Sequence, residues 1–215
     1  LEAVAEGFTV LKIKVGNDPA LDLQRVQAIR AAVGDGIRMR LDANQGWTPK
    51  QAVRTIKQLE AEGLNIELIE QPVKGYDVDG LKYVTDHVDT DIMADESVFG
   101  PRDVFRLLAL RACDIINIKL MKAGGLYPAE KIAHQAETQG VECMMGCTLE
   151  SKVGITAATA LAAGKRIVTR ADLDTPMLLA EDPVVGGVSF KGNRLYLPDA
   201  PGLRICDVRG WQEIS

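Results

Sequence analysis

The sequence predicts an α/β fold in which parallel strands curl into a TIM-like barrel with helices around it. Two observations favour this class. Apolar runs of strand length alternate with helical patterns along the chain. The first five runs each close on a charged residue, at intervals of 24 to 28 residues, which is about the length of a strand–helix unit. Because a parallel barrel gathers its strand ends on one rim, these charges predict an active site there.

Seven strands are predicted in this way. Five close on Lys14, Asp42, Glu70, Asp95 and Lys119, and two more lie at 142–145 and 167–171. A closed barrel of this kind has eight strands, and residues 1–7 have the pattern of a helix end. We therefore expect residues 1–187 to form strands two to eight of a barrel whose first strand is absent. Residues 188–215 break the pattern, with turn signals at 191–193 and 199–202, and are expected to form a folded-back tail.

Helices are predicted between the strands from their start and stop signals. Asp18 and Thr48 are good N-caps, and each is followed by proline at the first helical position. Further helices are predicted at 79–88, 101–110, 127–139 and 152–163, and glycines at 140 and 164 end the last two.

The composition excludes several classes of function. With 215 residues, 47% hydrophobic, the chain can bury one large core, and its net charge of −5 without basic clusters argues against nucleic acid as a partner. No apolar run reaches the roughly 18–20 residues of a membrane span. The four cysteines lack zinc-type spacing and are expected to be reduced packing thiols in a cytoplasmic protein.

Three of the predicted strand-end residues are acids on consecutive strands, Asp42, Glu70 and Asp95. Their carboxylates should converge on one rim, and hard anionic oxygens without nearby His or Cys favour Mg²⁺, with Mn²⁺ as the alternative. Asn44 shares a face with Asp42 and is expected to orient a ligand from just outside the metal's coordination sphere. The alternative, without a metal, is that the acids are solvated or serve as helix N-caps.

Lysines occupy the matching positions on two other strands. Lys12 and Lys14 point to the same face of one strand, and Lys119 closes a strand four units later. The alternative is an edge strand whose lysines face water, although parallel strands are normally covered on both faces. Two lysines facing each other over a divalent cation could act as bases, one removing a proton from carbon and the other returning it from the opposite side. That chemistry is racemisation or epimerisation, with the metal stabilising the enediolate of a carboxylate substrate.

The motifs carry a resemblance to a known family. Together they resemble the enolase superfamily, in its muconate-lactonizing subgroup: Lys12-Ile13-Lys14, Asp42-Ala43-Asn44, Glu70-Gln71-Pro72, Asp95-Glu96-Ser97 and Asn117-Ile118-Lys119 with Gly124-Gly125. The superfamily uses Lys or His bases with Mg²⁺, so this chemistry also follows from the resemblance. The resemblance implies a capping domain before the barrel, against which the tail would pack and which helps to choose the substrate.

Residues at the end of the last predicted strand distinguish the different activities within this subgroup. Asp172 and Asp174 are similar to the Asp-x-Asp of dipeptide epimerases, which holds the substrate's α-ammonium group. Glu150 resembles the acid that members of the subgroup carry on the preceding strand, the seventh of the barrel. An acid pair suits a cation and would repel a second carboxylate. The alternative is an Asp N-cap beside a salt-bridged neighbour.

The resulting hypothesis is a Mg²⁺-dependent epimerase of an L-Ala-D/L-Glu type dipeptide. Lys14 and Lys119 would exchange the proton, and Lys12 would neutralise the enediolate. One rival is an N-succinylamino acid racemase, o-succinylbenzoate synthase or cycloisomerase of the same subgroup. Another is a barrel fragment without catalytic activity. The expected partner is a small carboxylate, without nucleic acid or membrane, and the sequence leaves open whether the protein is a homo-oligomer.

Overall fold

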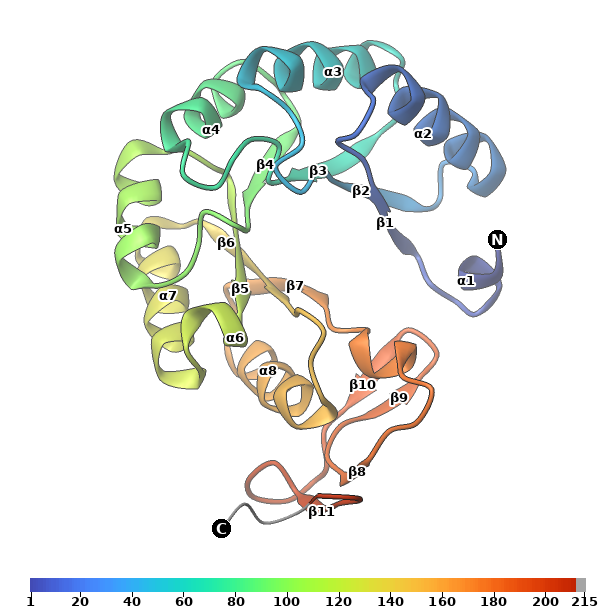
Figure 1. Cartoon of the computed structure of the whole chain (residues 1–215), viewed down its shortest axis with the longest axis vertical. Helices are drawn as coiled ribbons and strands as arrows, with labels where there is room; N and C mark the ends of the chain where they lie inside the picture. The colour runs from blue at the N-terminus through green and yellow to red at the C-terminus, as the bar shows by residue number, and fades with distance from the viewer. Residues whose placement is uncertain (212–215) are drawn as a thin grey trace. The chain divides into compact units, whose positions relative to one another are not determined.

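The structure, a computed structural model, describes residues 1–211. The chain divides into two compact units, the first Leu1–Asn117 and the second from Ile118 onward. Figure 1 shows the strands and helices of each in chain order. Within residues 1–211, no helix is long and apolar enough to cross a membrane.

The first unit is built on parallel strands that neighbour one another in chain order. They are β1 (Val10–Lys14), β2 (Arg38–Asp42), β3 (Ile66–Glu70), β4 (Asp91–Ala94) and the start of β5 (Ile115–Lys119). In the register, Lys14 lies opposite Asp42, and Asp42 lies opposite Glu70. The charged residues that close the strands therefore stand side by side, as the sequence pattern predicts.

A short helix precedes β1, and the helices that follow the strands lie along their outer side (Figure 1). They are α1 (Glu2–Ala5), α2 (Pro19–Val33), α3 (Pro49–Ala61), α4 (Val78–Thr85) and α5 (Pro101–Leu110). The predicted caps are present: Asp18 accepts from the amides of Ala20 and Leu21, and Thr48 forms a capping box with Gln51. Helix α4 ends three residues earlier than the predicted 79–88.

The core of the first unit lies between the strands and these helices. Strands β2 to β5 are mostly buried on both faces, as expected for parallel strands covered by helices. The largest fully buried side chains here are Met39, Leu41, Ile56, Leu68, Ile69, Leu81, Ile92, Met93, Leu107, Ile115 and Ile116. This packing fixes the positions of the strand ends, where the polar groups lie.

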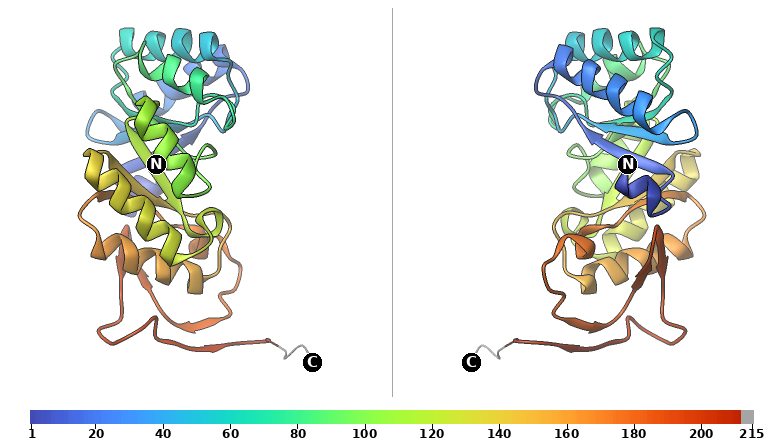
Figure 2. Two further views of the ribbon diagram at one scale, coloured as in Figure 1. Left: turned by 90° about the vertical axis from the view of Figure 1, so that its left-hand side faces the viewer. Right: turned by 90° about the vertical axis from the view of Figure 1, so that its right-hand side faces the viewer.

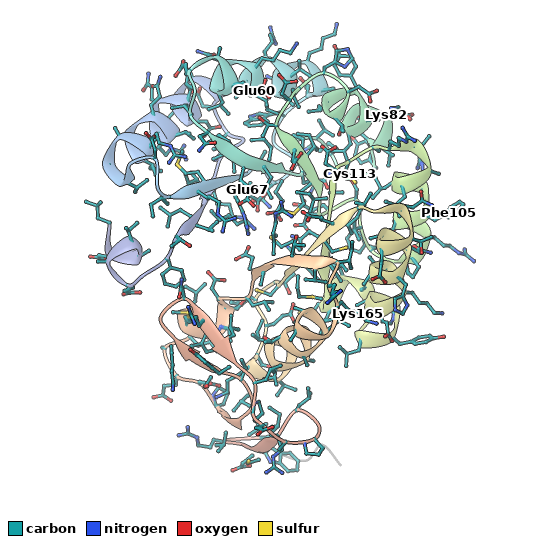
Figure 3. All side chains as sticks on the ribbon, turned by 180° about the vertical axis from the view of Figure 1, so that it is seen from behind. Glu60, Glu67, Lys82, Phe105, Cys113 and Lys165 are labelled. Atoms are coloured by element: carbon teal, nitrogen blue, oxygen red, sulfur yellow. The ribbon has the colours of Figure 1, made fainter. Side chains whose placement is uncertain are left out.

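A bulge between β2 and β3 brings Glu67 against Arg40 in the same sheet. The register passes from Met39 opposite Ile66 to Arg40 opposite Leu68, so Glu67 is the extra residue. The Glu67 carboxylate lies 2.7 Å from Nε of Arg40 and 3.7 Å from Nη1 of Arg38. Figure 3 labels Glu67 beside these strands. The two arginines thus have one shared acid, deeper than the strand ends.

The second unit continues the alternation of helix and strand. It contains α6 (Leu120–Ala123), α7 (Leu126–Gln139), β6 (Glu142–Gly146), α8 (Lys152–Gly164) and β7 (Val168–Asp172), with β6 and β7 parallel. The short helix α6 and the 3₁₀ helix η1 (Thr175–Leu178) were not predicted. Both directly follow strand ends, where a single turn leaves little periodic signal.

The tail forms two small antiparallel pairs (Figure 2). Strands β9 (Ser189–Lys191) and β10 (Arg194–Tyr196) form the hairpin predicted at 191–193. Strand β8 (Val184–Gly186) pairs instead with β11 (Ile205–Val208). The stretch 199–202 therefore links strands of different pairs and is not a hairpin turn. The tail contacts α8, since the amide of Val188 donates to the hydroxyl of Thr156.

Candidate active site

Lys12 bridges two of the predicted metal ligands in the first unit. Its Nζ lies 3.1 Å from Oδ2 of Asp42 and 2.8 Å from Oε2 of Glu70. Both carboxylates are buried. The three side chains come from the adjacent strands β1, β2 and β3, so the parallel register brings them together.

Lys14 lies two residues further along β1 and contacts the same acid. Its Nζ donates to Oδ2 of Asp42 at 2.6 Å and to Oδ1 of Asn44 at 2.8 Å. The side chain of Lys14 is 63% exposed and that of Lys12 is 22% exposed. Both lysines therefore point toward the acids, while Ile13 between them is buried. This arrangement differs from an edge strand whose lysines face only water.

Gln71 holds the backbone amide of Asp95, a role that its place in the Glu70-Gln71-Pro72 motif does not predict. Gln71 is fully buried and has a positive φ of 36°. Its Oε1 accepts from the amides of Asp95 and Ser97 at 2.8 and 3.1 Å, and its Nε2 donates to Oγ of Ser97 and to the carbonyl of Val73. Gln71 thereby ties the end of β3 to the segment that carries Asp95.

The acids sit in a strained electrostatic environment. The pKa of Glu70 is raised from 4.5 to about 7: burial is the largest cause, the charge of Lys12 lowers the pKa, and the charges of Asp42 and Asp95 raise it. Asn117 donates from Nδ2 to Oε1 of Glu70 at 2.9 Å, while its buried Oδ1 has no hydrogen-bond partner among residues 1–211. The Glu70 carboxyl, with its raised pKa, and the Asn117 oxygen without a partner are both groups that a bound cation would stabilise.

The three predicted metal ligands have the donor chemistry that a hard cation needs, although their carboxylates are not arranged around a common point. Asp42, Glu70 and Asp95 are buried and offer only oxygen. In the described part of the chain, however, no group of three or more His, Cys, Asp or Glu is arranged to hold a metal ion. Lys12 stands between two of the carboxylates instead. The three acids are neither solvated nor helix caps, because the following helices are capped by Thr48, Asp77 and Gly100.

Asn44 links Lys14 to a further acid. Its Nδ2 donates to Oε1 of Glu96 at 3.2 Å, and its backbone amide donates to Oδ1 of Asp42. The other oxygen of Glu96 is buried without a hydrogen-bond partner among the described residues. The sequence predicts Asn44 beside Asp42 but predicts no role for Glu96, which lies within the Asp95-Glu96-Ser97 motif.

The second unit holds the remaining candidates. Lys119 is the last residue of β5 and the N-cap of α6. Glu150 is buried, and its Oε1 accepts from the amide and hydroxyl of Thr148 at 3.0 and 3.3 Å. Asp172 closes β7.

Asp172 and Asp174 are separated by the buried Leu173, while Asp172 is half-buried and Asp174 is exposed. This alternation matches the prediction that the two acids share a side. Asp174 occupies the N-cap position of η1, but its side chain makes no capping hydrogen bond. The N-cap alternative therefore does not explain this acid.

The four cysteines are free, as predicted. Cys113 (labelled in Figure 3) and Cys143 are buried, and burial raises the pKa of the Cys143 thiol to about 12. Cys206 is exposed, so the prediction of a packing thiol is wrong for this residue. Cys206 lies on β11, which pairs with β8, and this two-stranded sheet is too small to cover the thiol.

Comparisons with known proteins define the family. Residues 1–205 match the family described as Enolase C-terminal domain-like, and the chain belongs to this family. It is 54% identical over 205 residues to the L-Ala-D/L-Glu epimerase of Clostridium acetobutylicum, covering 95% of this chain and 57% of that protein. The superfamily resemblance seen in the motifs is thus confirmed.

Solved structures agree with this assignment. A substrate-liganded L-Ala-D/L-Glu epimerase from Bacillus subtilis superposes with a TM-score of 0.95 at 53% identity, covering 96% of this chain and 58% of that one. The dipeptide epimerase from Enterococcus faecalis V583, complexed with Mg and L-Leu-L-Tyr, gives 0.87 at 50% identity, covering 96% and 56%. The predicted fold class is confirmed, and the chain spans little more than half the length of these relatives.

Proposed function

We propose that this chain supplies the catalytic barrel of a Mg²⁺-dependent dipeptide epimerase, with an L-Ala-D/L-Glu type dipeptide as substrate. The observation that carries the proposal is the Lys12–Asp42–Glu70 cluster with Lys14 beside it, on the strands where the family motifs lie. The names of the similar proteins support the same activity.

Asp42, Glu70 and Asp95 are the proposed ligands of the metal. A bound Mg²⁺ would supply positive charge for the substrate's carboxylate, and Mn²⁺ could replace it because both take oxygen ligands. Asn117 and Gln71 support this set, since one binds Glu70 and the other holds the amide of Asp95. Such outer partners fix the direction of a metal ligand.

Lys14 and Lys119 are the proposed bases at the α-carbon of the dipeptide's second residue. One would remove the proton and the other would return a proton from the opposite side, which inverts the centre. Lys12 would neutralise the charge of the enediolate that exists between the two transfers. Asp42 and Asn44 orient the Lys14 ammonium by accepting its hydrogen bonds.

Asp172 and Asp174 are proposed to bind the free α-ammonium group of the dipeptide, with Glu150 in the same polar network. Charge-assisted hydrogen bonds of this kind are short and strong. Asp172 is half-buried and Asp174 is exposed, so a cation can reach both side chains. This feature separates the epimerase proposal from an N-succinylamino acid racemase, whose substrate lacks that charge.

The test compares free and N-acylated substrates in the intact protein. Asp172→Asn and Asp174→Asn should each lower kcat/KM for the free dipeptide by roughly 30-fold or more, since losing one partner of a charged pair that the bound substrate would bury costs about 2–5 kcal/mol. Asp199→Asn, an exposed tail acid, is the control and should behave like the wild type. Mg²⁺ affinity should not change in any of the three variants.

The N-acylated substrate should be poor with the wild type and relatively less penalised in the two variants. If the wild type instead preferred N-succinylamino acids, the racemase alternative would replace the proposal. If no substrate of the panel incorporated solvent deuterium, the non-catalytic alternative would hold.

A further inference from the structure

A chain of hydrogen bonds joins the end of β6 to the end of β7 within the second unit. We call the three residues Cys147, Thr148 and Thr175 the β6–β7 bridge. Oγ1 of Thr175 donates to the carbonyl of Thr148 at 2.8 Å and lies 2.8 Å from Sγ of Cys147. The same sulfur lies 3.3 Å from the carbonyl of Asp172. The contacts therefore run from one strand end to the other.

The bridge touches both parts of the proposed ammonium site. At one end, the amide and hydroxyl of Thr148 donate to the Glu150 carboxylate. At the other end, Cys147 contacts the backbone of Asp172, and Thr175 directly follows Asp174 in the chain. A shift of Thr175 would thus move the acids and Glu150 relative to one another.

Strand pairing alone does not hold this region. The ladder between β6 and β7 ends with Gly146 opposite Asp172, so Cys147 and the residues after Asp172 lie beyond it. Past that point, the backbone bond from Met177 to Asp174 is local to η1. The side chain of Thr175, which is buried, makes the cross-link that the ladder no longer provides.

The thiol is suited to a neutral, structural part in this link. The pKa of the Cys147 thiol is raised, chiefly by burial; hydrogen bonds with Thr175 lower it, and the charges of Asp172 and Asp174 raise it. The S–H group therefore keeps its proton and remains a donor. A thiolate here would instead repel the acids that are proposed to bind the substrate.

We propose that Thr175 and Cys147 are positioning residues that determine selectivity for a free α-ammonium group, by setting the directions of Asp172 and Asp174. This inference rests on the proposed epimerase function. Neither residue needs to touch the substrate. Their hydroxyl and thiol act through the backbone at the two strand ends.

The test replaces the hydroxyl without changing the size of the side chain. Thr175→Val should raise KM for the free dipeptide by about tenfold, the equivalent of one misplaced hydrogen bond. KM for an N-acylated dipeptide, which does not use the acid pair, should change by less than about twofold. Thr175→Ser retains the hydroxyl and should recover most of the selectivity.

Thr159→Val is the matched control, because Thr159 is also buried and its hydroxyl donates to one carbonyl, that of Ile155 in α8. It should lower the Tm much as Thr175→Val does but leave the ratio of the two KM values unchanged. Cys147→Ala and Cys147→Ser provide a second pair if Thr175→Val does not fold, with the serine variant closer to wild type.

Equal losses on both substrates, or the same loss in Thr159→Val, would show a purely structural role and overturn the inference. So would a serine variant no better than valine. A wild type that discriminates in favour of the N-acylated substrate would overturn the proposed function together with the inference, and this outcome is read from the wild type alone.

Discussion

Glu70 should make the stability of the metal-free protein fall as the pH rises. Its carboxyl group is buried beside two other acids, and its pKa is raised from 4.5 to about 7, first by burial. The unfolded chain loses this proton near its ordinary pKa, while the folded chain keeps it until about pH 7. Because the folded state binds more protons over that interval, the free energy of unfolding decreases with pH.

The size of the effect follows from the two pKa values. Each unit of difference corresponds to about 1.4 kcal/mol, so the step from 4.5 to about 7 corresponds to about 3 kcal/mol. This contribution is fully present below pH 4.5 and is lost as the pH rises through about 7. A loss of that size is a large part of the 5–15 kcal/mol typical of a folded domain.

The assay is urea unfolding in chelator from pH 4.5 to 8, for the wild type and Glu70→Gln. Glutamine keeps the shape but does not titrate, so the variant should lack about 3 kcal/mol of the decrease, and the difference reports Glu70 together with the charged groups that interact with it. Saturating Mg²⁺ should remove most of the wild-type slope, because a ligated carboxylate is stable without its proton. Glu181→Gln, at an exposed position, is the control. Identical slopes for the wild type and Glu70→Gln would refute the electrostatic description of the cluster.

Two further predictions address the bases and the buried ion pair. Lys14→Ala and Lys119→Ala should both stop epimerisation. Each variant should still exchange the α-proton of one epimer with deuterated solvent. If both variants exchanged the α-proton of the same epimer, the two-face mechanism would be wrong. Arg40→Met should cost about 3 kcal/mol in urea unfolding because it leaves the largely buried Glu67 without its closest cation. Arg38→Met, whose side chain is 61% exposed and 3.7 Å from the same acid, should cost less than about 1 kcal/mol, and equal losses would mean that the bulge pairing is misassigned.

The sequence predicts most of the fold and the core of the site because both depend on regular periods. The alternation of residues along a strand places Lys12 and Lys14 on one face. The repeat of the strand–helix unit then places Asp42 and Glu70 beside them, which the register confirms. Capping signals likewise fixed the starts of α2 and α3, where Asp18 and Thr48 act as predicted.

The parts that the sequence did not predict arise where periodicity fails. Glu67 reaches Arg40 through a bulge, which shifts the register by one residue and has no compositional signature here. Gln71 acts from a left-handed backbone conformation, and its four hydrogen bonds depend on how two loops meet. The exposed Cys206 and the link at 199–202 belong to the tail, where short strands give weak patterns.

The two lysines of β1 have different surroundings, which agree with the two different roles proposed for them. Lys12 lies between the buried carboxyl groups of Asp42 and Glu70, and its charge lowers the pKa of Glu70, so the ammonium and the ionised acids stabilise one another. That environment suits a residue that must keep its charge beside an enediolate. Lys14 shares only Asp42 and is 63% exposed, so solvent reaches its nitrogen. A base that trades the substrate's proton for a solvent proton requires this access, and the exposure of Lys14 therefore agrees with the deuterium exchange proposed for it.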